Sequence, residues 1–480
     1  MFASTRPVKR YLVETFGCQM NAHDSRRIEE VLDQAGWSPT DDPSTADLIV
    51  FNTCSVREKA EQKLRSAVGL LRPLKNARPE LCIAIAGCVA QQEGEKLLRR
   101  MTHVDVILGP DCIAELPALV EHVRDGGPPV VRTVFDLAAP AFLVARPRTS
   151  AREVASYVTV MKGCDERCSF CIVPYTRGSE RYRSADEIVL EIVGLAAGGV
   201  REITLLGQTV NSWHDPTRGG AQGEAESEFA SLLARIAAEV PTLARLRYTS
   251  PHPRHVTDAL VRAHAELPVL PAHVHLPVQS GSDRVLRRMI RRYSRDEYVQ
   301  RAAALRRARP GLTLSTDFIV GFPGETESDF LETLSLVGEV GFVAAFAFKY
   351  SPRPYTPSLK LGDDVPEEVK DDRLARLFEL VEAQQQAHLD TLVGTIDDVL
   401  VEGFSLDGSG SFVGRSSRHE IVHVAPPAGR DLRGELVRVR IERAYKHSLA
   451  AALVGEPAPP RAVEPGARVR LPLASPAGEP

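Results

Sequence analysis

The sequence lacks long hydrophobic runs and an excess of charge of either sign. No window approaches the roughly 18 uncharged apolar residues that a membrane-spanning helix needs, and residues 1–10 lack the apolar stretch of a secretory signal peptide. Lys and Arg number 59 against 63 Asp and Glu, a net charge of −4, so any nucleic-acid contact must come from local patches. We therefore expect a soluble, cytoplasmic protein with no membrane contact.

Cysteine is also scarce. Eight cysteines in 480 residues are too few for a disulfide scaffold, and in a reducing compartment their spacing points first to metal or redox chemistry. With 43% hydrophobic and 25% charged residues the composition is that of globular proteins, which excludes collagen-like, coiled-coil and wholly disordered chains. The length corresponds to about three domains.

Near the N-terminus, apolar strand-like runs each lead into a turn that carries cysteine and then into a helical pattern. They occupy residues 11–18, 47–54 and 82–88, and a fourth run at 104–108 lacks the cysteine. Strands alternating with helices predict a parallel α/β sheet, and parallel strands end at one shared edge. We therefore expect Cys18, Cys54 and Cys88 to converge. Cys82 and Cys112 lie off this pattern and are expected to be packing residues.

Strands and helices alternate again over the middle of the chain. The strands are predicted at residues 157–161, 202–206, 245–249, 273–276, 313–319 and 343–349, and the helices at 185–197, 228–239, 283–293, 296–308 and 327–338. Six such units predict a partial (β/α)6 barrel whose functional groups follow the strands. Residues 391–454 instead show short apolar runs between glycine turns, which predicts a small antiparallel β-barrel.

These patterns divide the chain into an α/β fold of three parts. The predicted ranges are 1–124 for the N-terminal parallel-sheet domain, 125–152 for a linker rich in Pro, Gly and Arg, 153–388 for the partial barrel, 389–454 for the β-barrel and 455–480 for a disordered tail.

Three further cysteines stand close together directly after the first strand of the middle part. Cys164, Cys168 and Cys171 have the spacing C-x3-C-x2-C, and such a loop can wrap one face of a cuboidal iron–sulfur cluster while leaving the fourth iron open. A partial zinc site or a chance occurrence is the alternative. Structural zinc sites take four ligands, and no fourth ligand follows at a matching spacing.

A C-x3-C-x-aromatic-C motif at the mouth of a partial barrel resembles the radical S-adenosylmethionine superfamily. The resemblance narrows to the methylthiotransferases, and within them to those that modify isopentenyladenosine in tRNA. It rests on motifs in order from about residue 10 to residue 454: Thr15-Phe-Gly-Cys-Gln-Met-Asn21, Asn52-Thr-Cys-Ser-Val-Arg-Glu-Lys-Ala60, Gly87-Cys-Val-Ala-Gln91, Met161-Lys-Gly-Cys164, Cys171-Ile-Val-Pro-Tyr-Thr-Arg-Gly178, Gly207-Gln-Thr-Val-Asn211, Thr249-Ser-Pro-His-Pro253, His275-Leu-Pro-Val-Gln-Ser-Gly-Ser282 and Phe318-Ile-Val-Gly-Phe-Pro-Gly-Glu-Thr326.

The resemblance implies two 4Fe-4S clusters. One, held by Cys164, Cys168 and Cys171, binds S-adenosylmethionine and cleaves it to a 5′-deoxyadenosyl radical. The other is an auxiliary cluster on Cys18, Cys54 and Cys88; buried free thiols are the alternative there. The implied reaction inserts a methylthio group at C2 of N6-isopentenyladenosine beside the anticodon and consumes two S-adenosylmethionine molecules per product. No catalytic residues beyond the cluster ligands are expected, because the cofactor carries the hard step.

The strand ends of the partial barrel are expected to hold S-adenosylmethionine. Ordinary turns after the strands are the alternative for each residue taken singly. The expected contacts are Gly207, Gln208, Ser250, Gln279, Ser280, Gly321 and Gly324. One departure concerns Tyr355, in Ser351-Pro-Arg-Pro-Tyr355-Thr-Pro357, where the family usually has glycine. This backbone position is therefore less free to take positive φ.

Contacts with an RNA are expected from two basic groups. Arg284, Arg287, Arg288, Arg291, Arg292 and Arg295 alternate with apolar residues at helical spacing, and Arg288, Arg291 and Arg292 are the predicted phosphate contacts; a solvated helix face is the alternative. The C-terminal barrel resembles the RNA-binding TRAM domain, with Arg415, Arg418 and Lys446 as candidates. Arg443 is a further candidate there. The resemblance further implies a tRNA anticodon arm, a flavodoxin-type electron donor, a sulfur donor and a monomer.

Other functions stay open on the residues alone. Methylthiolation of threonylcarbamoyl-adenosine in tRNA, or of a ribosomal-protein aspartate, would use the same two clusters. From another class, the chain could be a non-catalytic iron–sulfur regulator that binds RNA. A thiol–disulfide protein is disfavoured, because the C-x-x-C pair Cys168 and Cys171 lies inside the cluster motif.

Overall fold

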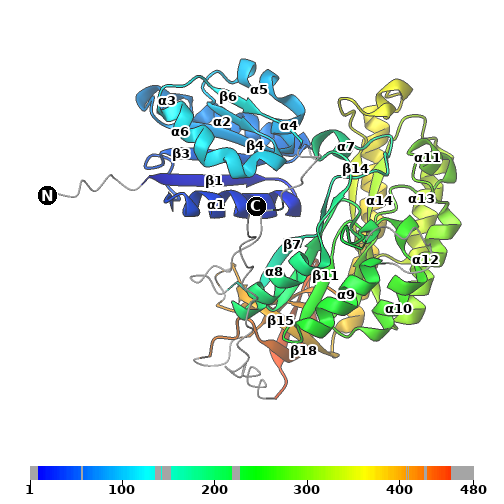
Figure 1. Cartoon of the computed structure of the whole chain (residues 1–480). Coiled ribbons are helices and arrows are strands. Elements are labelled where there is room, and N and C mark those ends of the chain that lie inside the picture. Colours follow the sequence, from blue (N-terminus) through cyan, green and yellow to red (C-terminus); the bar gives the residue numbers. More distant parts are fainter. Residues whose placement is uncertain are drawn as a thin grey trace, which may run out of the picture.

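Three parts follow one another along the chain in the computed structural model: an upper α/β domain, a central half-barrel and a lower closed barrel (Figure 1). The described residues are 9–55, 58–135, 142, 153–218, 228–406, 408, 410–425 and 430–455. Most of the predicted linker and nearly all of the predicted tail lie outside them. No helix of the described residues is both long enough and apolar enough to cross a membrane.

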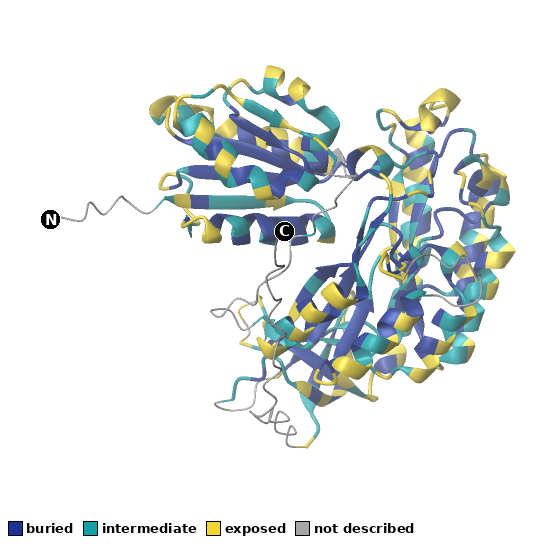
Figure 2. Ribbon diagram, in the orientation of Figure 1, coloured by how far each residue is buried: buried dark blue, intermediate teal, exposed yellow. Residues whose placement is uncertain are grey.

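The N-terminal domain is a six-stranded sheet of order β2-β1-β3-β4-β5-β6 in which all neighbours pair in parallel. Its strands are β1 (Arg10–Phe16), β2 (Ser38–Pro39), β3 (Leu48–Thr53), β4 (Cys82–Gly87), β5 (Val106–Leu108) and β6 (Val130–Arg132). The central strands β3 and β4 are buried along their whole length, as is usual where helices cover both faces of a parallel sheet (Figure 2).

Helices cover the two faces of this sheet. They are α1 (Gln19–Gln34), α2 (Glu58–Leu70), α3 (Arg72–Ala77), α4 (Cys88–Glu93), α5 (Glu95–Arg100), η1 (Pro110–Glu115) and α6 (Leu116–Arg124). On one face Ile28 of α1 and Val120 of α6 join the core, and on the other Leu64 of α2 and Leu97 of α5 do so. These four helices therefore bury apolar residues against the sheet.

The register of the sheet brings three strand ends to one level. Phe16 pairs with Thr53, and Thr53 pairs with Gly87. The chain reaches Cys18, Cys54 and Cys88 within two residues of these positions, so the predicted convergence of the three strand ends is confirmed.

The central part holds the six predicted strands. They are β7 (Ala155–Thr159), β10 (Glu202–Leu206), β11 (Arg245–Tyr248), β12 (His273–His275), β13 (Thr313–Val320) and β14 (Ala344–Lys349), with a short hairpin of β8 (Met161–Lys162) and β9 (Arg181–Tyr182). They form two parallel three-stranded sheets, β11-β10-β7 and β12-β13-β14. The sheet of the half-barrel is thus interrupted between β11 and β12.

Helices follow the strands of this half-barrel, and the longer ones pack on its outer face. They are α7 (Val173–Thr176), α8 (Ala185–Ala197), η2 (Val210–Ser212), α9 (Glu228–Glu239), η3 (Pro253–His255), α10 (Asp258–Glu266), α11 (Asp283–Arg288), α12 (Arg295–Ala308), α13 (Glu327–Val340), η4 (Pro357–Leu361) and α14 (Glu367–Leu392). Two cores lie beneath them, one around Ile203 and Leu246 and the other around Phe318 and Phe330.

The prediction of one long helix over 283–293 is wrong. Helix α11 ends at Arg288, and Ile290 and Arg292 take the left-handed backbone conformation with φ of 57° and 55°. The break turns the Arg291 side chain into the interior, where it is 6% exposed. The basic residues of this segment therefore do not share one helix face.

The C-terminal part is a closed barrel of order β15-β16-β17-β19-β18. Its strands are β15 (Ile396–Phe404), β16 (Phe412–Ser416), β17 (Ile421–Val424), β18 (Leu436–Ala444) and β19 (Ser448–Leu453). Arg245, at the start of β11, donates from Nη1 to the carbonyl of Arg415 at 2.6 Å, and Ala272 N, just before β12, donates to Ser417 Oγ at 3.1 Å. The barrel therefore docks on the amino ends of the half-barrel strands.

Tyr355 keeps the backbone conformation that favours glycine. Its φ is 69°, and its half-exposed ring packs on Tyr175 of α7 with the ring centroids 5.9 Å apart. A non-glycine residue in this region is strained. The loop after β14 thus carries a local cost that the ring contact with α7 partly offsets.

We expect Tyr355→Gly to be more stable than Tyr355→Ala by about 1 kcal/mol, because both lose the ring and only alanine keeps the strained Cβ. The matched control is Gly338 inside α13, where a Cβ meets nothing within 4 Å. Gly338→Ala should raise the free energy of unfolding by about 0.5–1 kcal/mol. Denaturant midpoints measure both. An alanine at 355 as stable as glycine would contradict the left-handed assignment.

Candidate functional site

The first three cysteines meet at the carboxyl edge of the N-terminal sheet. Cys54 donates a side-chain hydrogen bond to Cys18, and this bond lowers the pKa of Cys18 to about 6 even though burial acts in the opposite direction. Burial raises the pKa of Cys88, and the charge of Cys18 raises it further. All eight cysteines of the chain are free thiols. We call Cys18, Cys54 and Cys88 the N-terminal triad.

Two asparagines hold the loops that carry this triad. Asn21 Oδ1 accepts from the backbone N of Cys18 at 3.3 Å and lies 3.3 Å from Cys18 Sγ, and Asn21 Nδ2 donates to Asn52 Oδ1 at 3.2 Å. Asn52 Nδ2 donates back to the carbonyl of Asn21 at 2.9 Å. Both side chains are fully buried, so the β1 and β3 loops are locked together by satisfied polar groups.

Glycines let the chain turn sharply just before two of the cysteines. Gly87 has φ of 93°, and a Cβ there would lie 2.8 Å from the Thr53 carbonyl oxygen. Gly163 has φ of 82°, and a Cβ there would lie 2.0 Å from the carbonyl oxygen of Ser179. Only glycine fits either place without a shift of the backbone.

The second group of cysteines follows β7 and β8. We call Cys164, Cys168 and Cys171 the central triad. Burial raises the pKa of Cys171 to about 12, and the nearby charges of Cys168 and Cys164 contribute to this shift. Burial also raises the pKa of Cys164 to about 11, and its Sγ lies 3.0 Å from Thr209 Oγ1. These thiols must lose their protons to ligate iron, so cluster binding at this buried site releases protons.

One arginine joins the two triads. Arg177 follows α7 directly after the central motif and is 4% exposed. Its Nε donates to Cys88 Sγ at 3.2 Å, and its Nη2 donates to Asp24 Oδ2 of α1 at 2.5 Å. Helix α7 packs against α4, which begins at Cys88 (Figure 1). The carboxyl edges of the two domains therefore face one another.

The expected S-adenosylmethionine contacts fall into two groups. Gln208 follows β10, and both amide atoms of its side chain are buried without a hydrogen-bond partner among the described residues. Ser250 and Gln279 follow β11 and β12 with φ of 57° and 75°, an uncommon conformation that is frequent at binding sites. Gly207 packs tightly, because a Cβ there would lie 2.6 Å from Met161 Cγ. This edge offers unsatisfied polar groups to a ligand.

The other expected contacts are explained without a ligand. Gly321 N donates to Glu325 Oε2, and Gly324 N donates to Asp364 Oδ1, each at 2.6 Å. Ser280 is fully buried, and its hydroxyl accepts from Ser282 N at 3.2 Å. The geometry gives these three residues a role in shaping the loops, and their contact with S-adenosylmethionine stays a prediction.

A histidine and carboxylate group beside the central triad was not expected from the sequence. Glu166 Oε1 accepts from His255 Nε2 at 2.6 Å, and Glu166 Oε2 lies 4.0 Å from His252 Nε2. These ligand atoms are close enough to surround a metal ion. However, His252 Nδ1 accepts from Arg254 N at 3.3 Å, which places the ring proton on Nε2 and removes its lone pair. In this tautomer the group offers a metal no complete set of ligands, and Glu166 Oε2 and His252 Nε2 are buried without a hydrogen-bond partner among the described residues.

Most of the basic side chains expected to contact RNA form hydrogen bonds or ion pairs within the protein. The prediction is wrong for Arg291, which is buried and donates to Cys168 Sγ at 3.3 Å. Arg288 Nε donates to the Pro323 carbonyl at 3.0 Å, whereas Arg292 is exposed beside a hollow of about 50 Å³ that Arg254 and Arg301 also line.

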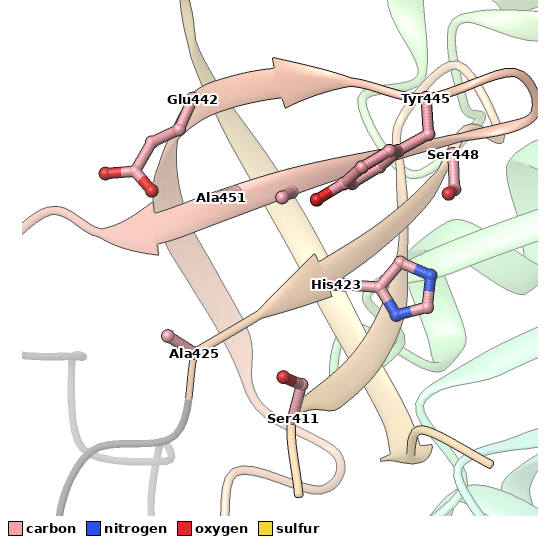
Figure 3. A pocket seen from close by; sticks show the side chains of 8 residues that line it. Ser411, His423, Ala425, Glu442, Tyr445, Ser448 and Ala451 are labelled. Carbon is pink, nitrogen blue, oxygen red and sulfur yellow. The ribbon is translucent and has the colours of Figure 1, made fainter. Parts of the chain in front are cut away.

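In the barrel, three of the four basic candidates have carboxylate partners, and the fourth, Arg443, has its guanidinium 5.1 Å from the ring centroid of Tyr445. Arg415 pairs with Glu402 at 3.4 Å, Arg418 pairs with Asp397, and the exposed Lys446 pairs with Glu382 at 3.1 Å. A hollow of about 390 Å³ opens on this barrel between His423, Glu442 and Tyr445 (Figure 3). Among the described residues its lining contains a carboxylate and neither Lys nor Arg, so these residues do not favour phosphate.

The roles of Arg177, Asp24 and Thr209 were missed from the sequence. Arg177 lies within a motif already recognised, six residues after Cys171, but a contact with a cysteine 89 positions earlier leaves no local pattern. Asp24 has its partner only through the packing of the two domains, and Thr209 meets Cys164 of another loop in the central domain, so neither contact leaves a local pattern.

Known proteins match both domains. Residues 10–109 match the Uncharacterized protein family UPF0004, and residues 158–337 match the Radical SAM superfamily. The chain is 61% identical over 463 residues to a tRNA-2-methylthio-N(6)-dimethylallyladenosine synthase of Sorangium cellulosum, covering 92% of this chain and 93% of that protein. It is 43% identical to the protein of the same name from Burkholderia thailandensis, covering 93% and 97%.

A solved structure shares the fold. The radical S-adenosylmethionine methyltransferase TsrM from Kitasatospora setae, with cobalamin and a [4Fe-4S] cluster bound, superposes with a TM-score of 0.51 at 15% identity, over 73% of this chain and 74% of that one. At this identity the likeness concerns the fold alone.

In metal-free protein we expect iodoacetamide to alkylate Cys18 rapidly at pH 7, because its pKa of about 6 leaves it mostly thiolate. The rate should fall about tenfold per pH unit below pH 6. Cys54→Ala, which removes the hydrogen bond, should move the midpoint upward, and Cys54→Ser should move it less. Peptide mass spectrometry measures this against Cys82, whose pKa burial raises to about 12. A midpoint unchanged in Cys54→Ala would contradict the Cys54–Cys18 contact.

Proposed function

The chain belongs to the family of the tRNA-2-methylthio-N(6)-dimethylallyladenosine synthases, and on that premise we propose that it transfers a methylthio group to C2 of N6-isopentenyladenosine beside the anticodon of a tRNA. It consumes two S-adenosylmethionine molecules per product. The observation that carries this proposal is the pair of cysteine triads on two facing sheet edges, joined by Arg177.

The donor sets fit the clusters that such a reaction needs. Each triad offers three thiols, which suits a cuboidal cluster with one open iron better than a closed zinc site with four ligands. Cys18 is already acidic, and buried guanidinium groups donate to Cys88 and Cys168. When bound, the central cluster supplies the electron that cleaves S-adenosylmethionine, and the auxiliary cluster carries the sulfur to be transferred.

The residues of the chain bind and orient the reactants. The amide of Gln208, which has no partner among the described residues, and the left-handed turns at Ser250 and Gln279 provide polar groups for S-adenosylmethionine after β10, β11 and β12. The closely packed loops around both triads limit water, which protects a carbon radical from side reactions. A radical route suits C2 of adenine, because no protein base is strong enough to remove that hydrogen as a proton.

The RNA must approach the facing edges rather than the opposite end of the half-barrel. The C-terminal barrel docks on the amino ends of the strands, so a tRNA that touches both would extend along the side of the central domain. Arg254 and Arg292, both exposed near the central triad, are the basic groups that we place nearest to the anticodon arm. We further propose a cytoplasmic monomer supplied by a flavodoxin-type electron donor and a separate sulfur donor.

The substrate is tested with the reconstituted full chain and three acceptors. We compare tRNA carrying isopentenyladenosine, tRNA carrying threonylcarbamoyl-adenosine and a ribosomal-protein peptide containing the target aspartate. The proposal expects the methylthio product by mass spectrometry only with the first. Product from either other acceptor would transfer the assignment to that substrate, and binding of RNA without 5′-deoxyadenosine would support a non-catalytic regulator.

We expect Cys168→Ala to abolish S-adenosylmethionine cleavage and Cys54→Ala to stop methylthio product while leaving cleavage partly intact, because the two residues belong to different triads. The matched control is Cys82→Ala, another buried cysteine of the N-terminal sheet, which should keep both activities. The assays measure 5′-deoxyadenosine and the modified nucleoside. Cleavage retained in Cys168→Ala, or full product in Cys54→Ala, would contradict the assignment.

A further inference from the structure

Each triad has one buried arginine that donates to one of its sulfurs. Arg177 Nε lies 3.2 Å from Cys88 Sγ, and Arg291 Nη1 lies 3.3 Å from Cys168 Sγ. The two guanidinium groups are 4% and 6% exposed. They come from different places in the chain, one after α7 and the other from the break after α11, so the recurrence does not follow from a shared motif.

The surroundings of the two arginines differ in charge. Arg177 forms an ion pair with Asp24 at 2.5 Å, and the guanidinium holds the pKa of Asp24 at about 2 against the opposite effect of burial. Among the described residues no carboxylate lies within 4.0 Å of the Arg291 guanidinium, which donates instead to the Tyr293 hydroxyl and the Pro277 carbonyl. Arg291 therefore keeps its full positive charge beside its triad, whereas Asp24 offsets that of Arg177.

Arg177 also has an unused donor. Its Nη1 is buried with no hydrogen-bond partner among the described residues, and a buried donor in this state is costly unless something accepts from it. The neighbouring sulfur groups of an iron–sulfur cluster are acceptors of the required kind. This is a second observation, separate from the bond to Cys88, that suits an anionic group at the N-terminal triad.

Hydrogen bonds to cluster sulfurs and nearby net charge are the protein's means of setting a cluster's reduction potential. A positive donor stabilises the more negative, reduced form. We propose that Arg177 and Arg291 are positioning residues that separately raise the reduction potentials of the auxiliary and the central cluster, with Asp24 reducing the effect of Arg177. This inference rests on the proposed function, because it requires a cluster at each triad.

The test isolates each cluster in the full chain. The Cys164, Cys168 and Cys171 triple-alanine protein retains only the N-terminal triad, and the Cys18, Cys54 and Cys88 triple-alanine protein retains only the central one. After anaerobic reconstitution, iron is counted and each potential is measured by redox titration followed by electron paramagnetic resonance. Arg177→Gln, Arg177→Lys, Asp24→Asn and Arg291→Gln are introduced into both backgrounds.

We expect Arg177→Gln to lower the auxiliary potential and to leave the central one unchanged, and Arg291→Gln to do the reverse with a larger shift. Asp24→Asn should raise the auxiliary potential, because it frees the charge of Arg177. Arg177→Lys keeps the charge and should shift the potential less than Arg177→Gln does. The opposite signs for Asp24 and Arg177 distinguish electrostatic tuning from general damage.

Potentials that stay fixed in all four variants while iron is retained would overturn the inference and leave the proposed function standing. If Arg177→Gln loses its iron, Asp24→Asn and Arg177→Lys decide the question, and an auxiliary potential that falls in Asp24→Asn would overturn it. Absence of iron from the parent triple-alanine proteins would instead overturn the proposed function, and this inference with it.

Discussion

The buried ion pair between Arg177 and Asp24 is the contact on which the arrangement of the two domains depends. It joins the segment after the central triad to the helix after Cys18, and the same guanidinium reaches Cys88. Two parallel sheets each present their carboxyl edge to a ligand, but only a contact between the edges makes one site of them. This charge pair contributes to the spacing between the triads, and the loss of either partner would leave the other buried and unpaired.

A second layer of buried charge supports this contact along α1. Arg27 pairs with Glu30 at 2.8 Å and lies 4.0 Å from Glu191 of α8, which also binds Arg183. These side chains are almost fully buried between the N-terminal and central domains. Well-packed apolar residues would hold the domains together at less cost in desolvation. We interpret the charges as fixing one relative orientation, because hydrogen-bonded pairs tolerate less sliding than an apolar face does.

Much of the fold could be predicted because its signals are local. Apolar runs and turn residues placed all six strands of the half-barrel and the three cysteine-bearing strands, and the common edge of a parallel sheet followed from topology alone. The prediction of one helix over 283–293 is wrong because the helical spacing of arginines in the sequence continues past Arg288. In the structure Arg291 instead lies in the interior and donates to Cys168. Arg177, Asp24 and the group around Glu166 could not be found from the sequence, since their partners lie in other elements and leave no periodic pattern.

The most direct test of two clusters on two facing triads is the iron and acid-labile sulfide content of anaerobically reconstituted protein. We expect about eight irons per chain, falling to about four in the triple-alanine variant of Cys164, Cys168 and Cys171 and to about four in that of Cys18, Cys54 and Cys88. About four irons in the unmodified chain, lost entirely when the central triad is removed, would contradict it. The N-terminal cysteines would then be structural, and the chain would be a single-cluster enzyme.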